Sequence, residues 1–199
     1  MFEKPLTVLF YGPSGSGKGT QAKLLQEFLR DNDSSRQSEY VETGALVRSF
    51  METSGYSQEL VRDAVGKGGL LPSFIPVYLW TKVLIEQLDG SEHLLLDGLA
   101  RREQTTDILD GALRFYGRHD YVVISFELSE QSIRDRLHGR GRGDDANESS
   151  VDEKLRWYRE EVVPAIASIE KLGATVHRID AEPSIEDIHK TVLETLHFK

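Results

Sequence analysis

Residues 12–20 decide the fold: they read Gly12-Pro13-Ser14-Gly15-Ser16-Gly17-Lys18-Gly19-Thr20 and stand between an apolar run at 6–11 and a segment with helical spacing. The pattern G-x-x-x-x-G-K in this position is typical of a loop that wraps a phosphate group. Its glycines let backbone N–H groups converge on the anion, and the following helix adds the positive end of its dipole. Lys18 adds a full charge. The stretch predicts a site for the phosphates of a nucleoside triphosphate.

Working outward, short apolar runs alternate with longer segments of helical spacing. The predicted strands are residues 6–11, 39–42, 93–96, 121–128 and 175–179, and the longer predicted helices are 18–30, 73–88, 151–172 and 184–198. Near-continuous apolar strands that alternate with helices are typical of a parallel sheet covered on both faces. The pattern predicts an α/β domain with a doubly wound, five-stranded parallel sheet.

Composition limits the classes of protein to which the chain can belong. It has 199 residues, enough for one domain, and 24 Lys and Arg against 33 Asp and Glu give a formal net charge of −9. An acidic chain argues against binding nucleic acid or an anionic membrane, because both need a basic face. The absence of cysteine excludes disulfides and thiolate metal ligands. No apolar stretch approaches the roughly 18 residues of a membrane span, so we expect a cytoplasmic protein.

Two segments depart from plain alternation of strand and helix. Residues 43–88 contain three helical pieces, broken at Gly55 and at 66–69, and no good strand. Residues 139–150 form a loop rich in Gly, Asp and Asn that carries Arg140 and Arg142. We expect the first to be a helical insertion and the second a mobile cover. Ser129 and Ser184 are predicted to cap the helices that follow them.

The segment Gly17-Lys18-Gly19-Thr20-Gln21 is more specific than the general phosphate loop and resembles the adenylate kinase family of nucleoside monophosphate kinases. Further motifs follow in that family's order over nearly the whole chain. The resemblance implies a P-loop nucleoside triphosphate hydrolase-like fold and a single domain over 1–199. Its core would be 1–42, 89–138 and 149–199, with a monophosphate-binding lobe at 43–88 and a short lid at 139–148. It also implies a monomer that binds Mg²⁺, ATP and AMP, or ADP.

The acceptor site follows from three resemblances. The segment 43–48 is similar to the family's S-T-G-D-x-x-R, which implies that Arg48 pairs with the acceptor phosphate and that Thr43 lies near its base. The turn 69–72 is similar to the one that touches base and ribose. Leu95-Leu96-Asp97-Gly98-Leu99-Ala100-Arg101 resembles L-D-G-F-P-R. The residues expected at AMP are Thr43, Gly44, Arg48, Gly69, Leu71, Gly98, Arg101 and Gln104.

The donor site and the transfer machinery are implied in the same way. The residues expected at ATP are Gly12, Gly15, Ser16, Gly17, Lys18, Gly19, Thr20, Arg136 and Pro183. Asp97 and Thr20 would hold Mg²⁺, largely through water. The expected catalytic cations are Lys18, Arg101, Arg140, Arg142 and Lys154. In the family, the helix after the lid carries an arginine. Either Lys154 or Arg156, two positions further on, could take its role, and the sequence leaves this open.

Departures from the family pattern gather in the acceptor site. Ala45 replaces an aspartate that helps to hold the hydration shell of Mg²⁺, and Leu99-Ala100 replaces Phe-Pro. Thr43 and Gln104 favour AMP, although Gln104 comes one residue earlier than in many members. The expected reaction is ATP + AMP ⇌ 2 ADP. A kinase for UMP, CMP or another monophosphate, and a nucleotide-binding module with impaired catalysis, stay open as alternatives.

Overall fold

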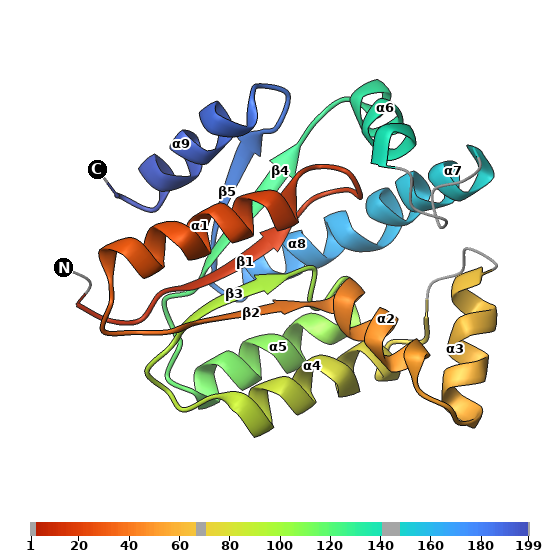
Figure 1. The fold of residues 1–199 in the computed structure, drawn as a ribbon, viewed down its shortest axis with the longest axis horizontal. Helices are drawn as coiled ribbons and strands as arrows, with labels where there is room; N and C mark the ends of the chain where they lie inside the picture. The colour runs from red at the N-terminus through yellow and green to blue at the C-terminus, as the bar shows by residue number, and fades with distance from the viewer. Residues whose placement is uncertain (1–2, 67–70, 141–147, 199) are drawn as a thin grey trace.

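The protein is described by a computed structural model that covers residues 3–66, 71–140 and 148–198. Five parallel strands form one sheet in the order β2-β3-β1-β4-β5 (Figure 1). The strands are β1 (Thr7–Tyr11), β2 (Ser38–Glu42), β3 (His93–Asp97), β4 (Val122–Glu127) and β5 (Thr175–Asp180). The predicted five-stranded parallel sheet is confirmed, including its weakest strand, which the sequence placed at 39–42.

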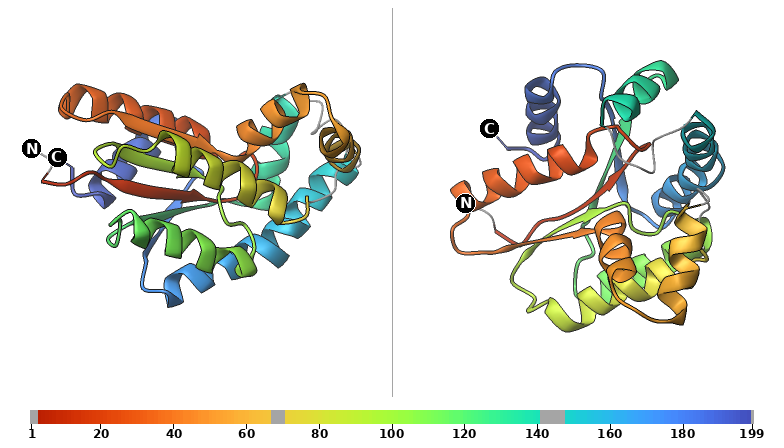
Figure 2. Two further views of the ribbon diagram at one scale, coloured as in Figure 1. Left: turned by 90° about the horizontal axis from the view of Figure 1, so that it is seen from below. Right: turned by 45° about the vertical axis from the view of Figure 1, so that its right-hand side comes forward.

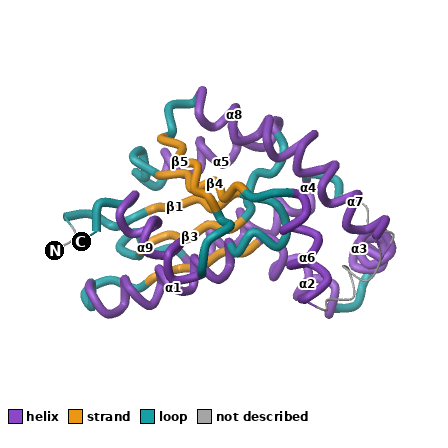
Figure 3. The backbone as a smooth tube through the Cα atoms, turned by 90° about the horizontal axis from the view of Figure 1, so that it is seen from above, coloured by secondary structure: helices purple, strands orange, loops and turns teal. Residues whose placement is uncertain are grey.

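Helices connect the strands and cover both faces of the sheet. They are α1 (Lys18–Asn32), α2 (Thr43–Glu52), α3 (Tyr56–Gly66), α4 (Phe74–Gln87), α5 (Glu103–Phe115), α6 (Glu130–Arg140), α7 (Glu148–Trp157), α8 (Val163–Lys171) and α9 (Ile185–Thr195). Figure 3 shows α1 and α9 on one side of the strands and α5 and α8 on the other. The helix predicted at 151–172 is interrupted by a π-helical turn, Tyr158–Val162.

The core has two layers because side chains of a strand alternate between the faces of the sheet. On β1, Val8 and Phe10 pack with residues of α1 and α9. Leu9 and Tyr11 pack with residues of α4, α5 and α8. All five residues of β1 are buried, and a strand covered on both faces therefore reads as a continuous apolar run.

The described residues of 43–88 form three helices, as predicted: α2 and α3 are separated at Gly55, and α4 begins at Phe74 after α3 has ended at Gly66. Helices α2 and α3 lie beyond the carboxyl ends of the strands, on the same side of the molecule as α6 and α7 (Figures 1 and 2). Helix α4 instead returns to the sheet, where Trp80 and Leu84 join the core. The expected lid begins inside α6, which ends at Arg140, and residues 141–147 lie outside the described part of the chain.

Both predicted helix caps are confirmed. The Ser184 hydroxyl accepts the backbone N–H of Asp187 at 3.1 Å, at the start of α9. The Ser129 hydroxyl accepts the backbone N–H of Ser132 at 3.2 Å, at the start of α6. Within the described ranges, the helices are too short or too polar to cross a membrane.

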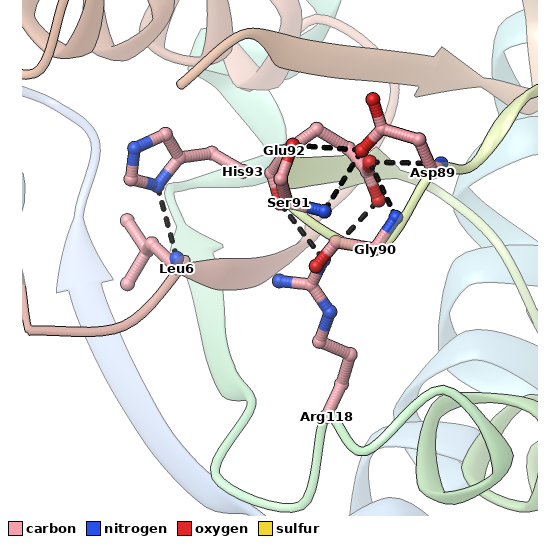
Figure 4. Close-up of polar contacts among 7 residues, drawn as sticks. All are labelled: Leu6, Asp89, Gly90, Ser91, Glu92, His93 and Arg118. Carbon is pink, nitrogen blue, oxygen red and sulfur yellow. Dashed lines mark hydrogen bonds and ion pairs between the residues drawn. The ribbon is translucent and has the colours of Figure 1, made fainter. Parts of the chain in front are cut away.

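Buried polar contacts fix the amino-terminal end of β3 (Figure 4). The Glu92 carboxylate accepts the N–H groups of Asp89 and Gly90 at 3.1 and 2.9 Å, and it pairs with Arg118 at 3.1 Å. The imidazole of His93 accepts the N–H of Leu6 at 2.9 Å through Nδ1. These contacts hold the segment before β3 against its neighbours, so the strand delivers Asp97 at its other end in a fixed register.

Candidate active site

Two adjoining cavities open at the carboxyl ends of the strands, where parallel α/β sheets bind ligands. The larger, of ≈ 810 Å³, is lined by the loop 12–20, by Asp97 and by residues around Pro183. The smaller, of ≈ 360 Å³, lies between α2, α4 and the start of α5. The residues that line both are Gly44, Arg48, Gly98, Arg101, Lys154 and Trp157. We call these six residues the junction.

The phosphate loop depends on glycine for its shape. Gly12, Gly15 and Gly17 have φ angles of 144°, 84° and 90°, in the left-handed region that other residues rarely adopt. A Cβ at Gly12 would lie 2.7 Å from the Ser16 hydroxyl and 2.9 Å from the Phe126 carbonyl oxygen. The loop therefore has room only for backbone at this position, and α1 begins directly after it at Lys18.

Lys18 lies over the loop. Its ammonium donates to the carbonyl oxygens of Gly12 and Pro13, both at 2.9 Å. A phosphate bound by the loop would offer anionic oxygens to the same ammonium, and charge-assisted hydrogen bonds are stronger than those to neutral carbonyls. The geometry thus fits the predicted role of Lys18.

Arg136 and Pro183 both line the larger cavity. Arg136 donates to the carbonyl oxygen of Ala181 at 2.7 Å. The Glu182 carboxylate accepts the Ser132 hydroxyl at 2.6 Å and the Ser129 N–H at 2.7 Å, and these bonds lower the pKa of Glu182 to about 2. The turn before α9 is therefore tied to α6, and a guanidinium plane is available beside it for stacking on a base.

Asp97 ends β3 and is buried in the wall of the larger cavity. Its Oδ2 accepts the phenol of Tyr40 at 3.0 Å, and burial together with this carboxylate raises the pKa of Tyr40. Gly19 packs against the pair, since a Cβ there would lie 3.4 Å from the phenol oxygen. Thr20 lines the same cavity.

These oxygen donors fit Mg²⁺ that arrives with a nucleotide. Protein-bound Mg²⁺ usually keeps several waters and takes one or two carboxylates together with substrate phosphates. Asp97 and Thr20 supply one carboxylate and one hydroxyl near the phosphate loop. In the described part of the chain, His, Cys, Asp and Glu side chains form no group of three that could hold a metal by themselves.

Three cations meet at the junction: Arg48, Arg101 and Lys154. Arg101 donates through Nε to the carbonyl oxygen of Gly98 at 2.9 Å. Gly98 has φ 66°, and a Cβ there would lie 2.5 Å from the Arg101 guanidinium, so this position also needs glycine. Arg48 donates to the Glu42 carboxylate at 2.9 Å. Anionic groups entering from the two cavities would meet these cations.

The smaller cavity is mostly apolar. The residues that give it this character are Val47, Met51, Val65, Leu71, Pro76, Val77, Trp80 and Ala100. The Thr43 hydroxyl is buried at its edge and has no hydrogen-bond partner among the described residues. Buried polar atoms are nearly always satisfied, so an unpaired hydroxyl in a cavity wall indicates a place for a ligand. An apolar cavity whose lining includes Arg48, Arg101 and Lys154 suits a nucleoside monophosphate.

Some predicted site residues are not placed in either cavity. Gln104 is exposed on α5 and lines neither, whereas Thr105, the next residue, lines the smaller one. Gly69 and Arg142 lie outside the described residues, and Arg140 is described only as the last residue of α6. Sequence reasoning also missed lining residues, namely Tyr40, Glu42, Arg102, Thr105 and Trp157. Polar residues at the end of β2 were the available signal for the first two.

The fold and the two cavities define a phosphotransferase that binds nucleotides at a phosphate loop. The adenylate kinase family model matches residues 10–174, and the chain belongs to the adenylate kinase family. It is similar to the adenylate kinase of Corynebacterium urealyticum, with 31% identity over 94% of this chain and 97% of the relative. It is also 31% identical to the adenylate kinase of Corynebacterium diphtheriae, over 96% and 99% of the two chains.

The UMP-CMP kinase of Lentinula edodes is 30% identical, over 95% of this chain and 85% of the relative. The family match and the relatives together identify a nucleoside monophosphate kinase, which is a phosphotransferase. This confirms the predicted class of enzyme.

Proposed function

We propose that the protein transfers the terminal phosphoryl group of ATP to AMP, reversibly, to give two ADP. The observation that carries this proposal is the junction, where Arg48, Arg101 and Lys154 line both the phosphate-loop cavity and the apolar cavity. ATP would occupy the larger cavity, with its phosphates in the loop and its base between Arg136 and Pro183. AMP would occupy the smaller one, with its base near Thr43 and its phosphate on Arg48 and Arg101.

Phosphoryl transfer needs alignment and charge more than it needs covalent chemistry from the protein. The acceptor oxygen of AMP is already anionic, so the site needs no general base. Two nucleotides bring several negative charges together, and the junction cations with Lys18 offset their repulsion. Arginine suits the task because its planar fork makes two charge-assisted bonds to a phosphate.

Mg²⁺ would be held through water by Asp97 and Thr20, and when bound it supplies charge to the phosphates of ATP. Arg140 and Arg142 are proposed to close over the phosphates once both substrates are present. Late closure of a loop excludes water and limits wasteful hydrolysis of ATP. We also propose that the protein is a cytoplasmic monomer. Size-exclusion chromatography with light scattering tests the oligomeric state.

A second candidate is transfer to UMP or CMP. Gln104, the amide expected to read adenine, is exposed and lines neither cavity, and Thr105 stands in the acceptor wall instead. Leu99 and Ala100 replace the family's Phe-Pro beside the acceptor base. One of the relatives is a UMP-CMP kinase. These features favour a less strict choice of base.

Phosphorus NMR of the protein with Mg·ATP and one acceptor at a time separates the candidates. The acceptors are AMP, GMP, UMP, CMP and dTMP, and the signal followed is formation of the diphosphates. We expect AMP to react fastest. A faster reaction with UMP or CMP would establish the second candidate. An absence of transfer to every acceptor, at concentrations where ATP binding is measured, would overturn both.

A further inference from the structure

Glu42 is an acidic side chain in a cavity that otherwise suits phosphate. It is the last residue of β2, in register with Asp97 at the end of β3, and it lines the larger cavity. Its Oε1 accepts a hydrogen bond from Nη2 of Arg48 at 2.9 Å. The side chain of Glu42 is 26% exposed and that of Arg48 is 48% exposed. The carboxylate therefore pairs with a guanidinium that lines both cavities.

Gly44 fixes where this ion pair lies. A Cβ at Gly44 would lie 3.0 Å from Nη1 of Arg48 and 3.0 Å from Oε1 of Glu42. The pair thus packs directly over the backbone of a junction residue, and any larger side chain would push it away. Because Gly44 lines both cavities, the carboxylate sits where the phosphates of donor and acceptor would approach each other.

We infer that Glu42 is an internal competitor for the phosphate of the acceptor nucleotide at Arg48. This rests on the proposed function, in which Arg48 binds that phosphate. The acceptor phosphate must displace the carboxylate from the guanidinium, and until it is displaced the carboxylate repels the incoming anion. A phosphate dianion carries more negative charge than a carboxylate and therefore replaces it at Arg48. The cost of displacement lowers the affinity for AMP and leaves that for an uncharged nucleoside unchanged.

Removing the Glu42 carboxylate is therefore expected to raise the affinity for AMP, although the residue lines the candidate active site. In Glu42→Gln, the amide keeps the size of the side chain and loses its charge. We expect the Kd for AMP to fall by about fivefold, the upper end for an exposed ion pair. The Kd for adenosine, which has no phosphate, stays within a factor of about two of wild type.

Equilibrium binding gives the test without turnover. The chain has two tryptophans, Trp80 and Trp157, and both line the smaller cavity, so their fluorescence reports binding there; isothermal titration calorimetry checks the result. The matched control is Glu39→Gln, which removes the same charge from the same strand at a residue that lines neither cavity. We expect it to bind AMP as the wild type does.

A second variant, Arg48→Met, separates this inference from the proposed function. If Arg48→Met weakens AMP binding and Glu42→Gln leaves it unchanged or weakens it, Glu42 is not a competitor and only this inference fails. If neither variant alters AMP binding, Arg48 does not bind the acceptor phosphate and both fail. Tighter binding of AMP and adenosine alike would also overturn the inference, because the gain would not depend on phosphate.

Discussion

The phenol of Tyr40 and the carboxylate of Asp97 are joined by a 3.0 Å hydrogen bond that links β2 to β3 inside the larger cavity. The bond engages Oδ2 of Asp97 and fixes the orientation of the carboxylate. Groups that orient the ligands of a metal contribute strongly to its affinity, although they do not touch it. Tyr40 is therefore a positioning residue for the side chain that we propose holds the water shell of Mg²⁺.

Tyr40→Phe removes this hydrogen bond and keeps the ring. We expect the Mg²⁺ concentration that gives half-maximal activity to rise by about tenfold, because Asp97 loses its orientation. Affinity for ATP without Mg²⁺, measured by calorimetry, should stay as in the wild type. Equal weakening of ATP binding with and without Mg²⁺ would mean that Tyr40 acts on the cavity as a whole.

Lys18→Met removes the charge that lies over the phosphate loop. Turnover in the ATP and AMP assay is expected to fall by about 10²–10³-fold, the range for losing one group that stabilises developing charge. The thermal unfolding midpoint should change little, because the hydrogen bonds of the ammonium to Gly12, Pro13 and Ser16 are made within the loop itself. The control is Lys82→Met, at an exposed residue of α4 that lines neither cavity, and it should keep full turnover.

Ala100 has φ 47° and is buried beside the acceptor cavity. A left-handed conformation costs a residue with a Cβ about 1–2 kcal/mol, whereas glycine adopts it freely but loses more entropy on folding. We expect Ala100→Gly to raise the free energy of unfolding by about 0.5 kcal/mol, measured in urea. Ala112→Gly, in the helix α5, is the contrasting control and should lower it by about 1 kcal/mol.

His93 makes stability depend on pH. Burial lowers the pKa of its imidazole below 6.5, and Nδ1 accepts the Leu6 N–H, which a protonated ring cannot do. The folded protein therefore resists protonation more than the unfolded chain does. The stabilisation is present above the unfolded pKa, near 6.5, and is lost as pH falls through the lower folded value.

Urea unfolding at pH 7.5 and at pH 5.5 measures this effect. The wild type should lose stability at the lower pH, and His93→Asn should lose less because the titrating group is gone. His119→Gln alters an exposed histidine and should keep the wild-type dependence on pH. A His93→Asn variant with the full wild-type dependence would assign the effect to other titrating groups.

Local features of this protein were readable from the sequence. The phosphate loop is nine consecutive residues whose shape follows from glycine at positions with positive φ. The sequence motif alone therefore predicts the shape of the loop. The strands appeared as apolar runs because a sheet covered on both faces buries nearly every side chain, as on β1 and β3. The caps at Ser129 and Ser184 depend on contacts three residues apart.

Only the tertiary structure decided which side chains face each other across the site. Gln104 and Thr105 differ by one position, yet about 100° of helical rotation separates them, and the packing of α5 turns Thr105 toward the acceptor cavity. The Tyr40–Asp97 bond exists because β2 lies beside β3 in the sheet. The Glu42–Arg48 pair needs the turn from β2 into α2 over Gly44. A motif fixes the residues that are neighbours in sequence, whereas strand order and helix rotation fix the neighbours in space.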